Sequence, residues 1–191
     1  PVFDWMRIGA KTGTKCVEAM VMDFADDVAY SVHDFEDAIV EGYVDLGVLA
    51  DPAAEHELLS KASEWSGGSF SVDSLRAGLS RLRELPYWPV AYTGTDVDQG
   101  RLKNLSSALI GSFVSRATES SYQATPDGSL SRYHSSLVVP EQVETEIAVL
   151  KGLVAAFLMT HESRRPYYEW QRAILTELAT ALLNSNGRDL E

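Results

Sequence analysis

The apolar residues of this chain recur at helical spacing over most of its length. One series has steps of four, three and four residues: Val28, Val32, Phe35 and Ile39. This spacing is typical of the apolar stripe of a helix that faces a core, so it predicts one long helix over residues 14–44. Similar signals predict five further helices, over residues 52–65, 71–85, 96–121, 140–163 and 165–187.

Residues 122–140 break this pattern. Pro126-Asp127-Gly128 is a turn signal, and β-branched and aromatic residues flank it. We therefore expect a small hairpin near residues 122–138, or an extended loop. The chain has no internal repeat and no low-complexity segment. The predicted fold class is all-α, a multi-helix domain with that small β-hairpin as an option.

Composition places the chain among ordinary globular proteins. Its 191 residues are 45% hydrophobic and 23% charged, which suits one domain, or one and a half, with a real core. A single cysteine, Cys16, excludes an internal disulfide framework and a multi-cysteine zinc site. It also suits a reducing compartment. The longest apolar run, residues 153–159, is too short to cross a bilayer, so we expect a cytoplasmic protein without a membrane partner.

The net charge of −12 limits the classes of partner. Nonspecific nucleic-acid binding depends on Lys and Arg side chains that neutralise phosphates, so we expect no nucleic-acid partner for this chain. A small anionic ligand is still compatible with this charge, because a metal ion or a local basic cluster reverses the field inside a cleft.

The most distinctive acidic segment is MDFADDVAYSVHDFEDAI, residues 22–39. Residues four apart on a helix lie about 40° from one another. Asp26, Tyr30 and Asp34 therefore share one strip that is about 80° wide. Two further carboxylates roughly continue this strip: Asp37 and Glu41. The predicted helix thus has one apolar face and one carboxylate-rich face with a tyrosine among the carboxylates.

Two interpretations of the acidic face stay open on the pattern alone. An acidic helix face in an acidic protein is commonly just solvated. A solvated face, however, normally carries Lys or Arg at i+4 positions, and there is none between Glu18 and Asp51. This gap favours a cation opposite the helix, either a metal ion or a basic partner. A DDxxD motif for magnesium and a diphosphate does not fit, because Tyr30 stands where the third carboxylate is needed.

The same segment resembles a helix of a known enzyme family. ADDVAYSVHDFED, residues 25–37, is similar to a pattern of the HD-domain deoxynucleoside triphosphate (dNTP) triphosphohydrolases, the dGTPase family. There an Asp is followed by a Tyr and another Asp at intervals of four. Weaker similarity extends through residues 100–114 and 147–178. The resemblance implies that residues 1–50 are the distal part of an HD-type catalytic core and residues 51–191 a helical, phosphohydrolase-associated region.

The resemblance also implies a reaction, in which a dNTP is hydrolysed to the deoxynucleoside and tripolyphosphate with Mg²⁺ or Mn²⁺. The matched positions make Asp26 a metal ligand, Tyr30 a contact of the substrate near its sugar and phosphates, and Asp34 the acceptor for the 3′-hydroxyl. These side chains suit the roles, because carboxylates bind hard cations and accept from hydroxyls, and a phenol offers both a face and a hydroxyl. Basic residues that are candidates for the triphosphate are Lys103, Arg116 and Arg101.

The chain departs from the family in its metal motif. The family binds its metal with a His, a His-Asp pair and a more distant Asp, and no H…HD set precedes Asp26 here. His33 and Asp34 form a literal HD pair, but it follows Asp26, and we expect His33 to lie at the surface or behind the ligands. One aspartate cannot hold a catalytic ion. The other metal ligands must therefore come from outside this chain, in which no catalytic set is complete.

These departures predict the C-terminal part of a longer enzyme that is inactive by itself. The first residue, Pro1, is not a methionine and fits this expectation. The implied partners are a dNTP, the missing N-terminal half of the same protein and further copies in a homo-oligomer. The alternative function is a non-catalytic all-α module for oligomerisation or for binding a regulatory nucleotide. A helical metal-storage protein is disfavoured, because its histidines and carboxylates do not recur at ExxH spacing.

Overall fold

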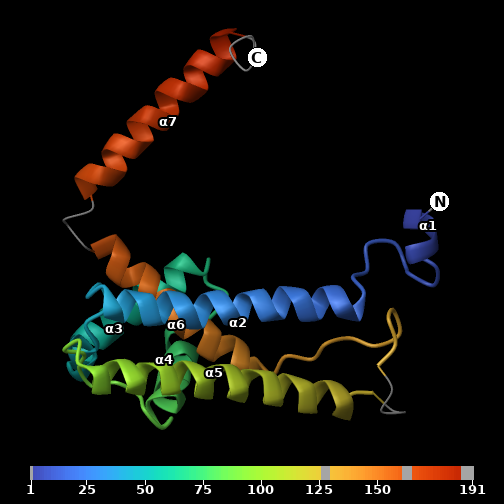
Figure 1. Ribbon diagram of the computed structural model, residues 1–191, viewed down its shortest axis with the longest axis horizontal. Coiled ribbons are helices and arrows are strands. Elements are labelled where there is room, and N and C mark those ends of the chain that lie inside the picture. Colours follow the sequence, from blue (N-terminus) through green and yellow to red (C-terminus); the bar gives the residue numbers. More distant parts are fainter. Residues whose placement is uncertain (1, 126–129, 161–164, 186–191) are drawn as a thin grey trace.

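The computed structural model describes residues 2–125, 130–160 and 165–185, and these residues form an all-α structure without strands. The elements are α1 (Val2–Met6), α2 (Val17–Val40), the 3₁₀ helix η1 (Leu46–Ala50), α3 (Pro52–Trp65), α4 (Val72–Arg83), α5 (Asp96–Gln123), α6 (Glu141–Thr160) and α7 (Arg165–Ser185). Figure 1 shows α2 to α6 in one bundle, α1 beyond the start of α2 and apart from the bundle, and α7 extending away from the other end. The predicted fold class is confirmed.

Polar side chains define the beginnings of three helices. Asp51, Ser71 and Thr95 precede α3, α4 and α5, and each accepts a hydrogen bond from a backbone N–H of the first turn, at 3.0, 3.1 and 3.2 Å. Such caps satisfy N–H groups that have no partner within the helix. Local sequence therefore determines where these helices start.

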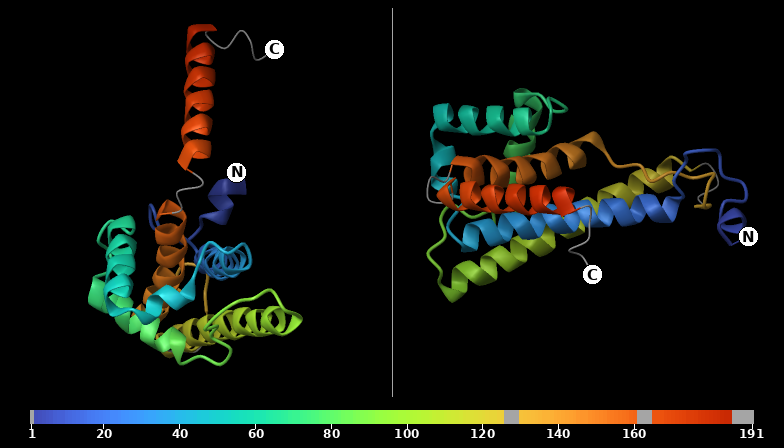
Figure 2. Two further views of the ribbon diagram at one scale, coloured as in Figure 1. Left: turned by 90° about the vertical axis from the view of Figure 1, so that its left-hand side faces the viewer. Right: turned by 90° about the horizontal axis from the view of Figure 1, so that it is seen from above.

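α6 lies at the centre of the bundle, where it packs against α2, α3 and α4 and touches α5 (Figure 2). Val143, Leu150 and Leu153 of α6 are fully buried. The predicted apolar stripe of α2 is buried as well: Val28, Val32, Phe35 and Ile39. Phe35 stacks on Trp88 of the segment between α4 and α5, with ring centroids 5.5 Å apart. This burial sets the rotation of α2 about its axis, and so decides which residues of α2 face solvent.

The hairpin expected near residues 122–138 does not form in the described residues. α5 continues to Gln123, and residues 135–140 run extended beside the bundle without pairing to another strand in that part of the chain. The backbone N–H of Val138 donates to Ser121 Oγ of α5 at 2.8 Å. A helix side chain thus takes the place that a partner strand would have. The turn signal at residues 126–128 lies outside the described residues.

The remaining predicted helices agree with the structure to within a few residues. α2 spans Val17–Val40 and is shorter at both ends than the predicted helix over residues 14–44. Its N-cap is Cys16, and just beyond its end Gly42 adopts a φ of 72°, which does not continue a helix. Among the described helices, none is long and apolar enough to cross a membrane.

The division predicted at residue 50 stays a prediction. Residues from both sides of it share one hydrophobic core, for example Phe35 of α2 and Leu59 of α3. α7 differs from the other long helices, because no described helix packs along it (Figures 1 and 2).

Candidate functional site

Asp26, Tyr30 and Asp34 lie on the side of α2 that faces away from the bundle. Because Val28, Val32 and their neighbours in the stripe are buried, Asp26, Tyr30 and Asp34 are placed in solvent. The Tyr30 side chain is 60% exposed. The structure therefore brings Asp26, Tyr30 and Asp34 together on one open face, as their spacing predicts.

Cations from other parts of the chain partly relieve the charge of α2. Lys151 of α6 lies 2.7 Å from Asp27, and Lys15 pairs with Asp23. Although the sequence around α2 contains no Lys or Arg, residues from other parts of the chain therefore place cations beside this helix. Residues outside the helix supply cations to four of its carboxylates: Glu18, Asp23, Asp27 and Glu36.

Four other carboxylates of this segment form no ion pair within the described residues, although the charge of Lys103 acts on Asp37. Within the described residues, no hydrogen bond or ion pair involves the side chains of Asp26, Asp34, Asp37 and Glu41. Tyr30 stands among them. We call these five residues the acidic face. An exposed, unpaired carboxylate row costs stability through like-charge repulsion, so it is the part of α2 on which a cation would act most strongly.

His33 lies beside the acidic face and is exposed. Its Nδ1 is 2.8 Å from the carbonyl oxygen of Ala29, one turn earlier on the same helix. This local hydrogen bond fits the expected surface position of His33.

Lys103 of α5 lies at the edge of the acidic face, where it pairs with Glu36 of α2. Glu36 is buried and accepts a second hydrogen bond, of 2.6 Å, from Ser106 Oγ. Burial by itself raises the pKa of the Glu36 carboxyl, but the hydrogen bonds from Lys103 and Ser106 and the charges of Lys103 and His33 outweigh it. The pKa of Glu36 is therefore below its ordinary value, and the carboxylate stays ionised.

Arg116 of α5 lies elsewhere and has a different environment. Its guanidinium donates a hydrogen bond of 2.6 Å to Glu146 of α6 and another of 3.3 Å to Gln142. Glu146 is buried and also accepts from Arg81 of α4 at 2.6 Å. Neither Arg116 nor Lys103 forms a hydrogen bond or ion pair with Asp26, Tyr30 or Asp34 among the described residues.

The acidic face does not make a complete metal site. In the described ranges, no group of three or more His, Cys, Asp or Glu side chains is close enough to hold an ion. A divalent cation needs three or more protein ligands for a catalytic site, and Asp26 supplies one at most. Further ligands for an ion at Asp26 would have to come from outside these residues.

Comparisons with known proteins place the chain in a family. Residues 137–191 match the family described as "Phosphohydrolase-associated domain". The chain is 38% identical over 186 residues to a deoxyguanosinetriphosphate triphosphohydrolase-like protein of Bifidobacterium longum, covering 96% of this chain. It is 40% identical over 183 residues to a protein of the same description from Streptomyces coelicolor, covering 95% of this chain. The chain belongs to the deoxyguanosinetriphosphate triphosphohydrolase-like family.

The dGTPase-like chain is shorter than these relatives. It spans 38% of the Bifidobacterium longum protein, 43% of the Streptomyces coelicolor protein, and 40% of a third relative from Corynebacterium diphtheriae, to which it is 38% identical over 173 residues. No solved structure matches the chain. The descriptions of these three relatives name them as triphosphohydrolase-like proteins. More than half of each relative has no counterpart in this chain.

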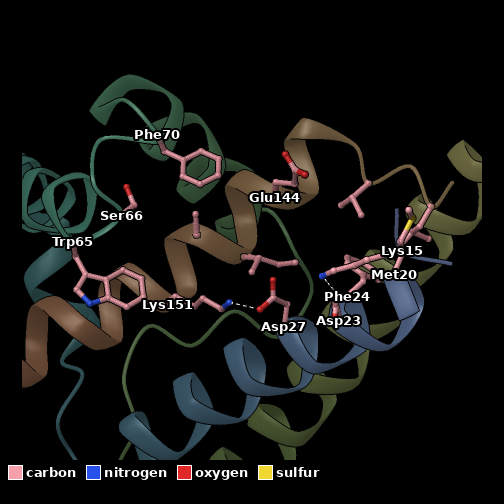
Figure 3. A pocket seen from close by; sticks show the side chains of 14 residues that line it. Lys15, Met20, Asp23, Phe24, Asp27, Trp65, Ser66, Phe70, Glu144 and Lys151 are labelled. Carbon is pink, nitrogen blue, oxygen red and sulfur yellow. Dashed lines mark hydrogen bonds and ion pairs between the residues drawn. The ribbon is translucent and has the colours of Figure 1, made fainter. Parts of the chain in front are cut away.

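One surface of this dGTPase-like chain was not predicted from its sequence. A cleft of about 600 Å³ opens between α2, α6 and the α3–α4 connection (Figure 3). We call it the aromatic groove, and its lining includes Lys15, Phe24, Trp65, Phe70, Ile147 and Lys151. Phe24 lies four residues before Val28, so it extends the apolar stripe of α2. That periodicity is the signal available in the sequence, but it does not reveal that no side chain covers Phe24 fully.

Proposed function

We propose that the protein to which this chain belongs is a metal-dependent dNTP triphosphohydrolase, and that this chain supplies one wall of its active site. The reaction is attack of water on the α-phosphate, which breaks its bond to the 5′-oxygen and yields a deoxynucleoside and tripolyphosphate. The acidic face carries this proposal: among the described residues Asp26, Tyr30 and Asp34 have no hydrogen-bond or ion-pair partner for their side chains, and they are exposed on a helix that the core holds in place.

Three residues of the acidic face have roles that their chemistry suits. Asp26 offers carboxylate oxygens to a divalent cation, Mg²⁺ or Mn²⁺, whose other ligands come from outside this chain. Tyr30, one turn later, offers a ring face and a hydroxyl to the sugar and phosphates. Asp34, another turn on, accepts a hydrogen bond from the 3′-hydroxyl. The rise of about 6 Å per four residues spaces these contacts along one nucleotide.

Lys103 is the better of the two candidate triphosphate ligands. Its side chain is 73% exposed, so it can reach a phosphate from solvent, and the buried Glu36 would then keep the hydrogen bond from Ser106. The Arg116 side chain is 29% exposed and bridges α5 to a buried carboxylate of α6. Moving Arg116 to a phosphate would leave Glu146 with one cation fewer, which costs stability in a buried site.

The proposed partners follow from the same arrangement. They are a dNTP, the remainder of the same protein, which completes the metal site, and further copies of the protein in a homo-oligomer. The chain by itself is then inactive. We place the enzyme in the cytoplasm.

The deciding experiment uses the whole protein. Wild type and Asp26→Ala are incubated with each dNTP and Mg²⁺ or Mn²⁺, and released tripolyphosphate is measured. Asp23→Ala is the matched control, since it removes a carboxylate one turn earlier on α2 that pairs with Lys15. Release by wild type and Asp23→Ala, with none from Asp26→Ala, supports the proposal.

Two results would contradict it. Release that survives Asp26→Ala would separate the acidic face from the chemistry. No release from any dNTP with either metal would favour the non-catalytic alternative, a module for oligomerisation or for binding a regulatory nucleotide. Binding of labelled dNTP to the same samples then distinguishes those two roles.

A further inference from the structure

The roles proposed for Asp26 and Asp34 give the substrate a direction along α2. The α-phosphate lies at the ion on Asp26 and the 3′-hydroxyl at Asp34, so the sugar lies on the C-terminal side of Asp26. The two residues are eight positions apart, which is about 12 Å along the helix axis. The β- and γ-phosphates leave the α-phosphate on the side away from the sugar. They therefore extend towards the N-terminus of α2.

Cations gather at this N-terminal end of α2. Lys15 comes just before the helix and pairs with Asp23 (Figure 3). Arg132 lies 3.6 Å from Glu18, in the first turn. The aligned peptide dipoles of a long helix add partial positive charge at the same end. An anion that extends from Asp26 towards the start of α2 thus leaves the acidic face and approaches cations.

The partners of Lys15 and Lys103 show how far each cation lies from Asp26 along the helix. Asp23, the partner of Lys15, is three residues before Asp26, about 4.5 Å along the axis and 60° around it. Glu36, the partner of Lys103, is ten residues after Asp26, about 15 Å along the axis in the direction of the sugar. Lys15 is therefore the cation on the phosphate side of Asp26.

The ammonium of Lys15 is available to a ligand. Its side chain is 64% exposed and that of Asp23 is 46% exposed, and exposed ion pairs of this kind are weak. An ammonium has three N–H donors, so Lys15 can donate to phosphate oxygens with or without Asp23, and Asp23→Ala should leave this contact intact. Lys151, which pairs with Asp27, is only 29% exposed and is less free to turn to a ligand.

We propose that Lys15 binds the β- and γ-phosphates of the dNTP, so that the substrate lies along α2 with its triphosphate towards the start of the helix. The inference rests on the proposed function and adds a residue and a direction to it. The β- and γ-phosphates keep their bonds in the reaction, so Lys15 contacts them equally in the substrate and in the transition state. Such uniform binding lowers KM and leaves kcat unchanged.

Steady-state kinetics of the whole protein test this contact. Lys15→Met should raise KM for the dNTP at least about tenfold, as expected for the loss of a hydrogen bond between charged groups, with kcat within about twofold of wild type. The inhibition constant of tripolyphosphate should rise by a similar factor, and that of the deoxynucleoside should stay within about twofold. Lys15→Arg, which keeps the charge, should recover most of the affinity.

Lys61→Met is the matched control. Lys61 is also a lysine with one carboxylate partner, Glu57, but both lie on α3. Its replacement should leave KM, kcat and both inhibition constants within about twofold of wild type. Equal effects of Lys15→Met and Lys61→Met would contradict the proposal. So would an equal rise in the inhibition constants of deoxynucleoside and tripolyphosphate, which indicates a distorted site and not a lost phosphate contact.

A further variant distinguishes the two ends of the acidic face. A rise in KM with Lys103→Met and none with Lys15→Met would overturn the proposed direction of the substrate and assign the phosphates to the end at Glu36. Circular dichroism checks that Lys15→Met and Lys103→Met keep their helices.

Calorimetric titration with tripolyphosphate and Mg²⁺ separates this inference from the proposed reaction, because it needs no turnover. If wild type hydrolyses a dNTP but Lys15→Met binds tripolyphosphate as tightly as wild type, the inference fails and the proposed function stands. If wild type hydrolyses no dNTP, the proposed function fails. The phosphate site at Lys15 then stands if wild type binds tripolyphosphate at least about tenfold more tightly than Lys15→Met, and falls if the two are equal or neither binds.

Discussion

Arg116 of α5 donates a hydrogen bond of 2.6 Å to Glu146 of α6, a carboxylate whose side chain is 4% exposed. Arg81 of α4 donates to the same carboxylate at 2.6 Å. Two cations on different helices thus neutralise one buried anion, and the three residues join α4, α5 and α6. This arrangement gives Arg116 a structural role whether or not it also contacts a phosphate.

The Arg116–Glu146 pair predicts a graded loss of stability. Arg116→Met should lower the free energy of unfolding by roughly 1.5–3 kcal/mol, the range for a hydrogen bond to a charged group. Replacing Arg81 and Arg116 together should lower it by roughly 3–5 kcal/mol, because the buried carboxylate is then left without a cation. Urea denaturation of the chain measures both values.

Arg101→Met serves as the control for these variants. Arg101 is exposed on the same helix, and no hydrogen bond or ion pair of the described residues involves its side chain. Its replacement should change the free energy of unfolding by less than about 0.5 kcal/mol. A cost for Arg116→Met no larger than that of Arg101→Met would refute the structural role of the pair.

Substitutions in the acidic face, unlike that of Arg116, should have little effect on stability. Asp26→Asn and Asp34→Asn should leave the free energy of unfolding within about 0.5 kcal/mol of wild type, because these side chains are exposed and unpaired. The change, if measurable, should be towards higher stability, since each variant removes one negative charge from a like-charged row. Thermal unfolding followed by circular dichroism measures the effect.

Glu36→Gln is the contrasting variant on the same helix. It removes a buried carboxylate that accepts from Ser106 and pairs with Lys103, so it should cost roughly 1–3 kcal/mol. If Asp26→Asn proved as costly as Glu36→Gln, the acidic face would be a structural element and its assignment to ligand binding would lose its basis.

The helices of this fold could be predicted because their signals are local. The stripe from Val28 to Ile39 and the caps Ser71 and Thr95 depend on residues within one or two turns. The segment at residues 135–140 could not be predicted in the same way. Its backbone is held by Ser121, a residue of the preceding helix, and a turn signal alone does not tell which partner an extended segment will find.

The same distinction between local signals and distant partners applies to the candidate site. The shared face of Asp26, Tyr30 and Asp34 follows from intervals of four residues, and the structure places the three on one exposed face. Their roles stay predictions. The environments of Lys103 and Arg116 could not be derived from the sequence, because their partners are far away along the chain. The absence of Lys and Arg near α2 in the sequence was a poor guide for the same reason, since Lys151 comes from α6.

Acid should destabilise the start of α5. Asp98 accepts hydrogen bonds from the hydroxyl and the backbone N–H of Thr93, at 2.6 and 2.9 Å. These bonds, with smaller contributions from Thr95, lower its pKa from 3.8 to about 2. Because the folded-state pKa is depressed, the stabilisation by Asp98 is present above pH 3.8 and is lost as the pH falls towards 2.

Two variants test this pH dependence. Thr93→Val removes the hydroxyl donor and should raise the pKa of Asp98 towards 3.8, as measured by NMR titration of its carboxyl carbon. Asp98→Asn should reduce stability at pH 5, and its difference from wild type should shrink as the pH approaches 2. Asp96→Asn controls for the loss of a first-turn carboxylate as such. An unchanged titration of Asp98 in Thr93→Val would mean that the Thr93 hydroxyl does not set the pKa.

The contact between α3 and α6 depends on a glycine. A Cβ added at Gly152 of α6 would lie 2.5 Å from the Cβ of Ala62 and 3.3 Å from its Cα. The two helices would have to move apart around a residue that is at the centre of the core. Gly152→Ala should therefore lower the free energy of unfolding by roughly 1–3 kcal/mol, as overpacking typically does.

Gly111→Ala, in α5, should raise the free energy of unfolding instead of lowering it. A Cβ at Gly111 of α5 meets no atom within 4 Å, so the variant should gain roughly 0.5–1 kcal/mol from the higher helix propensity of alanine. The two substitutions are chemically identical, and only their surroundings differ. Urea denaturation of both should give changes of opposite sign. If Gly152→Ala were also stabilising, the close approach of α3 to α6 would be wrong, and with it the packing that holds α6 at the centre of the bundle.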